Sequence, residues 1–152
     1  MCSSDLAHAT MAPKPRRPWS REVAPDRPRM AAGLLLVFPG PRDAAHLLLT
    51  LRAGSLQRHG GQVSLPGGVV ETGESHADAA LREAREEIAL DPAMARVAGH
   101  LTPIDIPVSG FRLHPVVALA DTRPPVAPAA GEVARVFDVA IDRKSTRLNS
   151  SH

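Results

Sequence analysis

The sequence predicts a mixed α/β domain made of short strands and one strong helix. Three observations support this fold class: residues 31–38 form an uninterrupted apolar run, residues 75–90 repeat apolar positions with a helical period, and turns rich in Gly and Pro separate the other apolar segments. The 152 residues, 43% of them hydrophobic, suffice for one compact domain without disulfides. The lone Cys2 excludes a disulfide framework and a cysteine-based zinc site.

Strands are predicted where apolar runs are bounded by turn residues. A turn at 39–43 joins the first two strands, which we expect to pair with each other. Pro115 has no amide hydrogen, so its strand is expected at an edge or a bulge. Residues 132–141 form either a short helix or a last strand. The other predicted strands cover residues 31–38, 46–52, 62–65, 97–101 and 112–120.

One helix is predicted over residues 75–90. Ser75 is a suitable N-cap, and Asp78 three residues later can return its hydrogen bond. The helix ends before Pro92, because the proline ring cannot continue the hydrogen-bond ladder. Its apolar stripe, expected to pack on the sheet, consists of Ala77, Ala80, Leu81, Ala84 and Ile88.

Three parts of the chain differ in charge. Residues 1–29 carry a net charge of +3 and many prolines, and we expect them to be a disordered or extended lead-in. Residues 30–142 carry −4 and form the folded domain, whereas residues 143–152 carry +3. The basic pI of about 9.3 therefore belongs to the ends, and no nucleic-acid partner is expected. The alternative for the lead-in is a basic arm with Trp19 stacked on a base.

The extreme ends, residues 1–6 and 143–152, resemble translated sequencing-adapter sequence. We expect both to be non-native, with the natural start nearer Met11 or Met30 and the natural C-terminus missing; the alternative is an ordinary polar tail. The longest apolar run is far shorter than the roughly 20 residues that a membrane-spanning helix needs. A cytoplasmic protein without a membrane partner is expected.

Three carboxylates converge on one face of the predicted helix. Glu83, Glu86 and Glu87 stand at i, i+3 and i+4, where like charges repel. Such a face is either solvated or neutralised by a cation, and clusters of oxygen ligands suit hard ions such as Mg²⁺ or Mn²⁺. Arg82 and Arg85 can hold neighbouring carboxylates in place.

The stretch from Gly68 to Leu90 resembles the Nudix box. This box runs Gly, five residues, Glu, seven residues, Arg-Glu, an aliphatic residue, any residue, Glu-Glu, any residue, Gly and an aliphatic residue, and every charged position matches. Ala89 departs, because the box has glycine there. If that position needs a positive φ, alanine costs on the order of 1 kcal/mol.

Resemblance to the Nudix family implies an α/β/α sandwich with a mixed sheet, whose loop-helix-loop binds divalent cations and hydrolyses a diphosphate. Glu83, Glu86 and Glu87 would be the metal ligands, with the Gly68 carbonyl nearby. Glu74 would stabilise the loop-helix-loop. Arg82 would orient the glutamates and completes the catalytic set.

The segment upstream of the box, residues 48–68, is similar to that of the coenzyme A diphosphatase subgroup of this family. Its matching residues are Leu48, Leu49, Thr50, Arg52, Ala53, His59, Gly61, Gln62, Val63, Pro66, Gly67 and Gly68. Two positions depart from its pattern: Gln57 replaces an arginine and Leu65 replaces a phenylalanine. The resemblance implies hydrolysis of CoA or acyl-CoA to 3′,5′-ADP and a 4′-phosphopantetheine product. Gly54, Gly60 and Gly61 would let backbone amides approach an anion; the alternative is that Arg52 pairs with a strand neighbour and the glycines only serve a turn. The candidate substrate-binding residues are Arg52, Arg58, His59, Gly61, Gln62, Gly67 and Gly68.

Several alternatives remain open at this stage. Glu132 is a candidate general base or additional metal ligand, or else a surface cap. His100 and His114 are expected to be satisfied core or edge residues rather than ligands. The substrate is CoA or, alternatively, ADP-ribose, NADH or a nucleoside triphosphate. A further alternative is a catalytically silent binding module. The family would add a further C-terminal helix that the chain lacks, and a homodimer is compatible with the resemblance.

Overall fold

A computed structural model describes residues 27–54, 61–107 and 109–141. Among these residues, no helix has the length and apolar character needed to cross a membrane. The predicted lead-in and tail fall almost entirely outside the described residues, and the first strand begins at Arg29.

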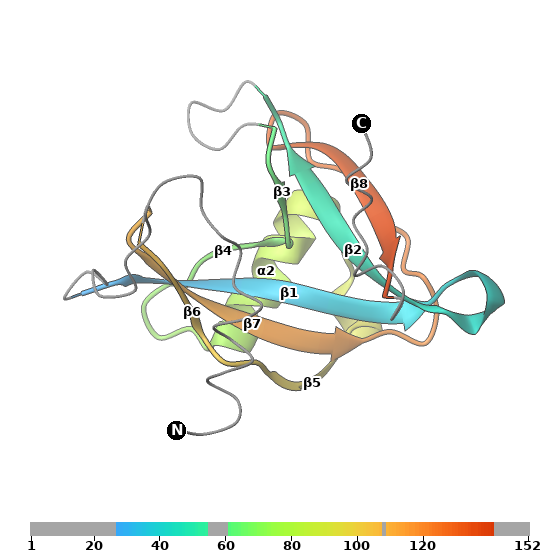
Figure 1. The fold of residues 1–152 in the computed structure, drawn as a ribbon, viewed down its shortest axis with the longest axis horizontal. Coiled ribbons are helices and arrows are strands. Elements are labelled where there is room, and N and C mark those ends of the chain that lie inside the picture. Colours follow the sequence, from blue (N-terminus) through green and yellow to red (C-terminus); the bar gives the residue numbers. More distant parts are fainter. Residues whose placement is uncertain (1–26, 55–60, 108, 142–152) are drawn as a thin grey trace, which may run out of the picture.

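Eight strands form one mixed sheet (Figure 1). β1 pairs in parallel with β7 and antiparallel with β2 and β4, whereas β5 and β6 pair antiparallel with β7. The strands are β1 (Arg29–Pro39), β2 (Ala45–Arg52), β3 (Val63–Ser64), β4 (Gly67–Val69), β5 (Arg96–His100), β6 (Ile104–Ile106), β7 (Phe111–Leu119) and β8 (Val133–Ala140). The prediction of a mixed α/β domain is therefore confirmed.

The β1–β2 hairpin opens into a fork, and the functional region is built in that fork. The two strands pair only near their turn, through Val37 to Pro39. Farther along, β2 pairs with β8 on one side and with β3 on the other, while β4 pairs with the first half of β1. Figure 1 shows β2 and β8 diverging from β1, with β3 and β4 between the two arms. Residues 63–69 thus bridge the fork, directly in front of the helix.

Helix α2 (His76–Ile88) covers one face of this sheet. Ser75 caps it as predicted: its Oγ accepts from Asp78 N at 3.1 Å and donates to Asp78 Oδ2 at 2.6 Å. Ala89 ends it in the left-handed region, at φ 54°. The short 3-10 turn η2 (Pro92–Met94) follows, with Asp91 as its cap. The described residues contain this single α-helix and two 3-10 turns.

The buried stripe of α2 is rotated relative to the prediction. Ala80, Ala84 and Ile88 are buried as expected, but Ala79 is buried as well, whereas Ala77 and Leu81 are only half-buried. At 100° per residue, this rotation places Glu87 within the arc of buried positions. The same face meets Ala32, Leu34, Leu36 and Phe38 of β1.

One further expectation is corrected, two short strands are added and one alternative is resolved. β7 is internal to the sheet, so Pro115 does not mark an edge; its carbonyl accepts from Leu101 N at 3.0 Å, and it lies where the pairing of β7 changes from β6 to β5. A proline is tolerated there because no strand requires its missing donor. β4 and β6 were not predicted, since strands of three residues carry too little pattern. Residues 133–140 form a strand, which resolves the helix-or-strand alternative.

His114 is not the satisfied residue that the sequence suggested. Its ring stacks on that of His76, with centroids 3.7 Å apart, and its buried Nε2 has no hydrogen-bond partner among the described residues. Burial first, and the nearby His76 second, hold the pKa of His114 below its ordinary value. A neutral imidazole is therefore favoured at this contact between α2 and β7.

Candidate functional site

Glu87 is the buried carboxylate at the centre of the fork. Only 6% of the residue is exposed. Its Oε2 accepts from the backbone N–H of Gly67 at 3.0 Å, and its Oε1 lies 3.7 Å from Arg52 Nη1. The side chain is thus held between the β3–β4 segment and the end of β2.

Burial dominates the electrostatics of Glu87. It raises the pKa of this carboxyl to about 6, against the hydrogen bond from Gly67 and the charge of Arg52, which lower it. The carboxylates of Glu83 and Glu132 raise it further. Negative charge is therefore concentrated in a partly desolvated place, where a cation would be strongly favoured.

Two glycines permit this close assembly. A Cβ on Gly67 would lie 2.2 Å from the carbonyl oxygen of Ala32, so β4 can approach β1 only without a side chain there. A Cβ on Gly68 would lie 2.4 Å from Cδ of Glu83. Glycine is thus needed at both positions: at Gly67 the backbone of β1 occupies the space of a side chain, and at Gly68 the carboxylate of Glu83 does.

Arg82 connects the loop before α2 to the glutamates on it. Its Nε and Nη2 donate to the two carboxylate oxygens of Glu74 at 2.8 and 3.2 Å, and Nη2 also donates to the Val69 carbonyl at 3.0 Å. Its Nη1 donates to Glu83 Oε1 at 2.9 Å and lies 3.5 Å from Glu86 Oε2. One guanidinium therefore fixes the loop, the helix and two of the three glutamates.

The charges of this network stabilise one another. Hydrogen bonds from Arg82 hold the pKa of Glu74 below its ordinary value, and the backbone N–H of Glu71 adds a further bond at 3.0 Å. Hydrogen bonding to Glu74 in turn raises the pKa of Arg82. Both groups stay ionised over the whole physiological pH range.

Arg52 has a different environment. Its buried Nε has no hydrogen-bond partner among the described residues, and its closest described carboxylate is the distant Oε1 of Glu87. The backbone of Arg52 is fixed by Gln62 O and Gly61 N, at 2.9 and 3.0 Å. Gly61, at φ 75°, makes the turn that brings these segments together.

The loop between β7 and β8 completes the site from the other side. Ala129 N donates to the Glu87 carbonyl at 2.8 Å and Ala127 N donates to the Ile88 carbonyl at 2.9 Å, which satisfies the last carbonyls of α2. The carbonyl of Glu132, at the end of this loop, accepts from Ala53 N at 2.9 Å. This docking was not predicted, because the loop has no periodic pattern.

The predicted site residues are thus partly brought together. The fork collects Arg52, Gly61, Gln62, Gly67, Gly68 and the three glutamates, with Arg82 beside them, whereas Arg58 and His59 lie outside the described residues. The contact between Arg52 and Glu87 was not foreseen, since no local pattern connects β2 with α2. In the part of the chain that the structure describes, no three His, Cys, Asp or Glu side chains are grouped so as to hold a metal ion.

The donor set nevertheless fits a hard divalent cation. Every candidate ligand is an oxygen, and Glu83 rests on the Gly68 backbone where a side chain would be excluded. Arg82 here supplies the positive charge for Glu83 and Glu86, while Glu87 turns toward Gly67. Two features therefore suit a hard cation: the oxygen ligands themselves and the close approach of the Glu83 carboxylate to the Gly68 backbone.

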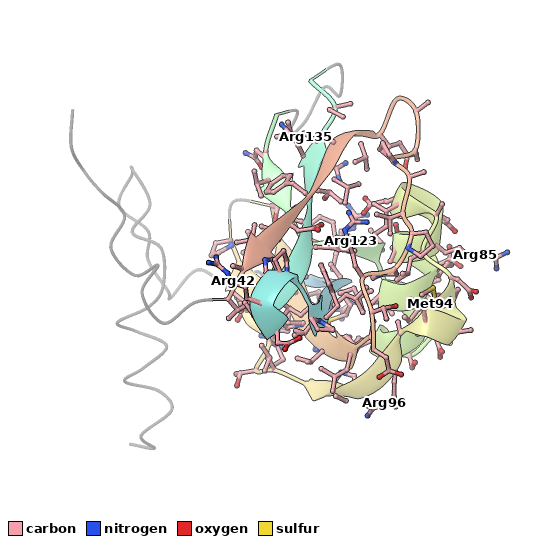
Figure 2. The ribbon with its side chains drawn as sticks, turned by 90° about the vertical axis from the view of Figure 1, so that its right-hand side faces the viewer. Arg42, Arg85, Met94, Arg96, Arg123 and Arg135 are labelled. Carbon is pink, nitrogen blue, oxygen red and sulfur yellow. The ribbon has the colours of Figure 1, made fainter. Side chains whose placement is uncertain are left out.

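A hollow of about 570 Å³ lies on the outer side of α2, adjoining the network of Arg82. Figure 2 shows Arg85 projecting away from the body of the domain on this side. Its lining combines charged side chains with two apolar ones: Glu74, Asp78, Leu81, Arg82, Arg85, Glu86 and Pro92.

The fold and the box agree with known proteins. Residues 27–140 match the model of the NUDIX domain. The chain is 42% identical over 125 residues to an uncharacterized Nudix hydrolase NudL from Cronobacter sakazakii, which covers 82% of this chain and 63% of that protein. It is 42% identical over 115 residues to a protein of the same description from Pectobacterium atrosepticum, covering 75% and 58%. The chain therefore spans about three fifths of the length of these relatives.

Solved structures show the same architecture. A Nudix hydrolase from M. Smegmatis, RenU, superposes with a TM-score of 0.66 at 30% identity, covering 78% of this chain and 74% of that one. A C. elegans Ap4A hydrolase superposes with a TM-score of 0.60 at 20% identity, covering 72% and 79%, and shows the shared fold. With its matching domain, its box on α2 and these neighbours, the chain belongs to the Nudix hydrolase family.

Proposed function

We propose that this chain is a Mg²⁺- or Mn²⁺-dependent diphosphatase that hydrolyses CoA or acyl-CoA to 3′,5′-ADP and 4′-phosphopantetheine or its acyl form. The observation that carries this proposal is the contact between Arg52 and Glu87. Arg52 belongs to the upstream segment that resembles the CoA diphosphatases, whereas Glu87 belongs to the box. Their proximity supports a single site in which substrate recognition and hydrolysis meet.

Four groups would hold the cation: the carboxylates of Glu83, Glu86 and Glu87 and the carbonyl of Gly68. When bound, the cation supplies charge neutralisation on the diphosphate oxygens and lowers the pKa of water. The raised pKa of Glu87 supports this assignment, because a buried carboxylate surrounded by others gains most from a positive neighbour.

Arg52 would bind a phosphate of the substrate. Its Nε is buried and without a described partner, and a phosphate oxygen would satisfy it with a charge-assisted hydrogen bond. Arg58, His59, Gly61 and Gln62 would extend this contact along the loop, and Gly67 and Gly68, which carry no side chain, would let the backbone lie close to the diphosphate. Arg52 and Arg58 would thereby balance two negative charges of the substrate.

Arg82 would keep the glutamates oriented during the reaction. It holds Glu83 directly and fixes the loop through Glu74 and Val69. Glu132 would act as general base: it is exposed, and its charge acts on Glu87. In this step a water oxygen forms a bond to one phosphorus, the bridging P–O bond breaks, and the water proton moves to the Glu132 carboxylate.

A second candidate substrate is another nucleoside diphosphate derivative, such as ADP-ribose, NADH or a nucleoside triphosphate. The observation that favours it is Gln57, which stands where the CoA subgroup has an arginine and removes one cationic contact. The box and Arg52 would serve these substrates equally, since all contain a diphosphate.

A panel of substrates tests the proposal. The purified full chain is incubated with Mg²⁺ and, separately, with CoA, acetyl-CoA, ADP-ribose, NADH and ATP, and products are separated by chromatography. We expect 3′,5′-ADP from CoA, and a Glu87→Gln variant slower by on the order of 10²–10³-fold. Fast turnover of ADP-ribose without CoA hydrolysis would select the second candidate. A chain that is inactive on every substrate and shows no Mn²⁺ binding by calorimetry would be a silent module.

A further inference from the structure

The loop between β7 and β8 carries a feature that the reaction scheme leaves unused. Arg123 at its start makes a two-pronged ion pair with Asp138 of β8: Nε donates to Oδ2 at 2.6 Å and Nη2 donates to Oδ1 at 3.1 Å. Arg123 Nη1 also donates to the carbonyl of Pro124 at 3.3 Å. Figure 2 shows Arg123 between β8 and α2. The start of the loop is therefore tied to the strand that follows it.

The same loop is anchored along its length. We call residues 123–132 the strap. Pro124 is fully buried and Val126 packs against the core, so alternate residues point inward. Beyond them, Ala127 N and Ala129 N donate to the last two carbonyls of α2. The strap thus runs across the C-terminal end of the helix that carries the glutamates.

Glu132 is the last residue of the strap. Its backbone is fixed from two sides, because its carbonyl accepts from Ala53 N and its own N–H donates to Ala129 O at 3.3 Å. Gly131, at φ 86°, makes the turn just before it. The position of Glu132 relative to Glu87 therefore depends on the register in which the strap lies on α2.

We propose that Arg123 is a positioning residue: its pair with Asp138 fixes the register of the strap and so places Glu132 beside the glutamates of α2. This inference rests on the proposed function, in which Glu132 handles a proton. An exposed ion pair contributes little to stability. The pair is therefore expected to influence where the strap lies far more than whether the domain folds.

The chain contains a matched control for this pair. Arg112 of β7 makes the same two-pronged pair with Asp105 of β6, at 2.7 and 3.2 Å. The side chains are similarly exposed, 39% and 37% for Arg112 and Asp105 against 47% and 29% for Arg123 and Asp138. Arg112→Gln removes an equivalent ion pair at a place that does not contact the strap.

The experiment compares Arg123→Gln, Asp138→Asn and Arg112→Gln in the full chain. Amide hydrogen exchange at Ala127 and Ala129 is measured together with kcat and KM on whichever substrate the wild type hydrolyses. For Arg123→Gln and Asp138→Asn we expect exchange at both amides to be roughly two- to fivefold faster. Their kcat should fall roughly 10-fold with KM within twofold of wild type, because misplacing a catalytic group mainly slows the chemical step. Arg112→Gln should match wild type in all these quantities.

Two results would overturn the proposal. One is unchanged exchange at Ala127 and Ala129 in Arg123→Gln, and the other is faster exchange with a wild-type kcat. The double exchange Arg123→Asp with Asp138→Arg restores an ion pair and should recover at least half of the lost kcat. If the wild type hydrolyses none of the substrates, the proposed function fails, and the exchange rates alone decide whether Arg123 holds the strap.

Discussion

Two arginines lie against the carboxylates of α2, and they differ in how many of their donors have partners. Arg82 places all three of its guanidinium nitrogens on oxygen atoms of Glu74, Val69 and Glu83 at 3.2 Å or less. Arg52 lies 3.7 Å from Glu87, and its buried Nε has no partner among the described residues. A saturated arginine holds a structure together, whereas an unsaturated buried one is available to a ligand.

The box on α2 and the segment upstream of it therefore have different tasks. The network of Arg82 is complete without substrate, so it can keep the loop-helix-loop in shape throughout the reaction. The surroundings of Arg52 are incomplete, and an anion would complete them. Changes at the two arginines test this contrast directly, and changes at Glu87 and Ala89 test the helix against which both arginines lie.

Removing Arg82 should damage the scaffold and the activity together. Arg82→Ala leaves Glu74 and Glu83 without their cation and frees the loop before α2. We expect activity to fall by roughly 10–100-fold, as is typical for residues that orient metal ligands, with a lower Tm. Steady-state kinetics and thermal denaturation check both effects. A variant with normal activity and normal Tm would show that the network of Arg82 is dispensable.

Removing Arg52 should weaken substrate binding and spare the fold. For Arg52→Gln we expect KM to rise on the order of 10-fold, since a charge-assisted hydrogen bond to phosphate is lost, with Tm within about 2 °C of wild type. The reference is Arg82→Ala, which should lower Tm clearly under the same conditions. A drop in Tm of Arg52→Gln as large as that of Arg82→Ala would show that Arg52, like Arg82, mainly stabilises the fold.

Neutralising Glu87 should stabilise the domain while it slows the reaction. Its pKa is raised to about 6 from an ordinary value of 4.5, so the fold favours the protonated form. The associated stability is fully present below pH 4.5 and is lost as pH rises through about 6. At pH 7.5 we therefore expect Glu87→Gln to be more stable by roughly 1–2 kcal/mol, with no advantage at pH 4.

Urea denaturation at pH 4, 6 and 7.5 measures this effect. Glu86→Gln is the matched control, because Glu86 is 58% exposed and should gain little at any pH. Equal stability of Glu87→Gln and wild type at pH 7.5 would mean that Glu87 is not strained by its burial.

The smallest effect is expected at the end of α2. Ala89 adopts φ 54° and ψ 30°, a conformation that disfavours a side chain. Ala89→Gly should raise the free energy of unfolding by about 0.5–1 kcal/mol without changing kcat. Ala77→Gly is the control, since a glycine inside the helix should destabilise the domain by a similar amount.

The main strands and the helix were largely predictable because local sequence patterns specify them. The strands at 31–38 and 46–52, their pairing, the helix with its Ser75 cap and the positive φ suspected at Ala89 were all confirmed. The errors arose where the position of a residue depends on contacts with segments far along the chain. Pro115 could not be placed in an internal strand without knowing that β5 and β6 share one side of β7, and the apolar stripe of α2 could not be oriented without the sheet.

The candidate site divides in the same way. The local pattern was enough to place three glutamates on one face of a capped helix, because spacing and capping act within a few residues. The burial of Glu87 depends on the fold, which also brings Gly67 and Arg52 to it and docks Ala127 and Ala129 on the end of the helix. These contacts join segments far apart in the chain, and they depend on the fork between β1 and β2, which no local interaction specifies.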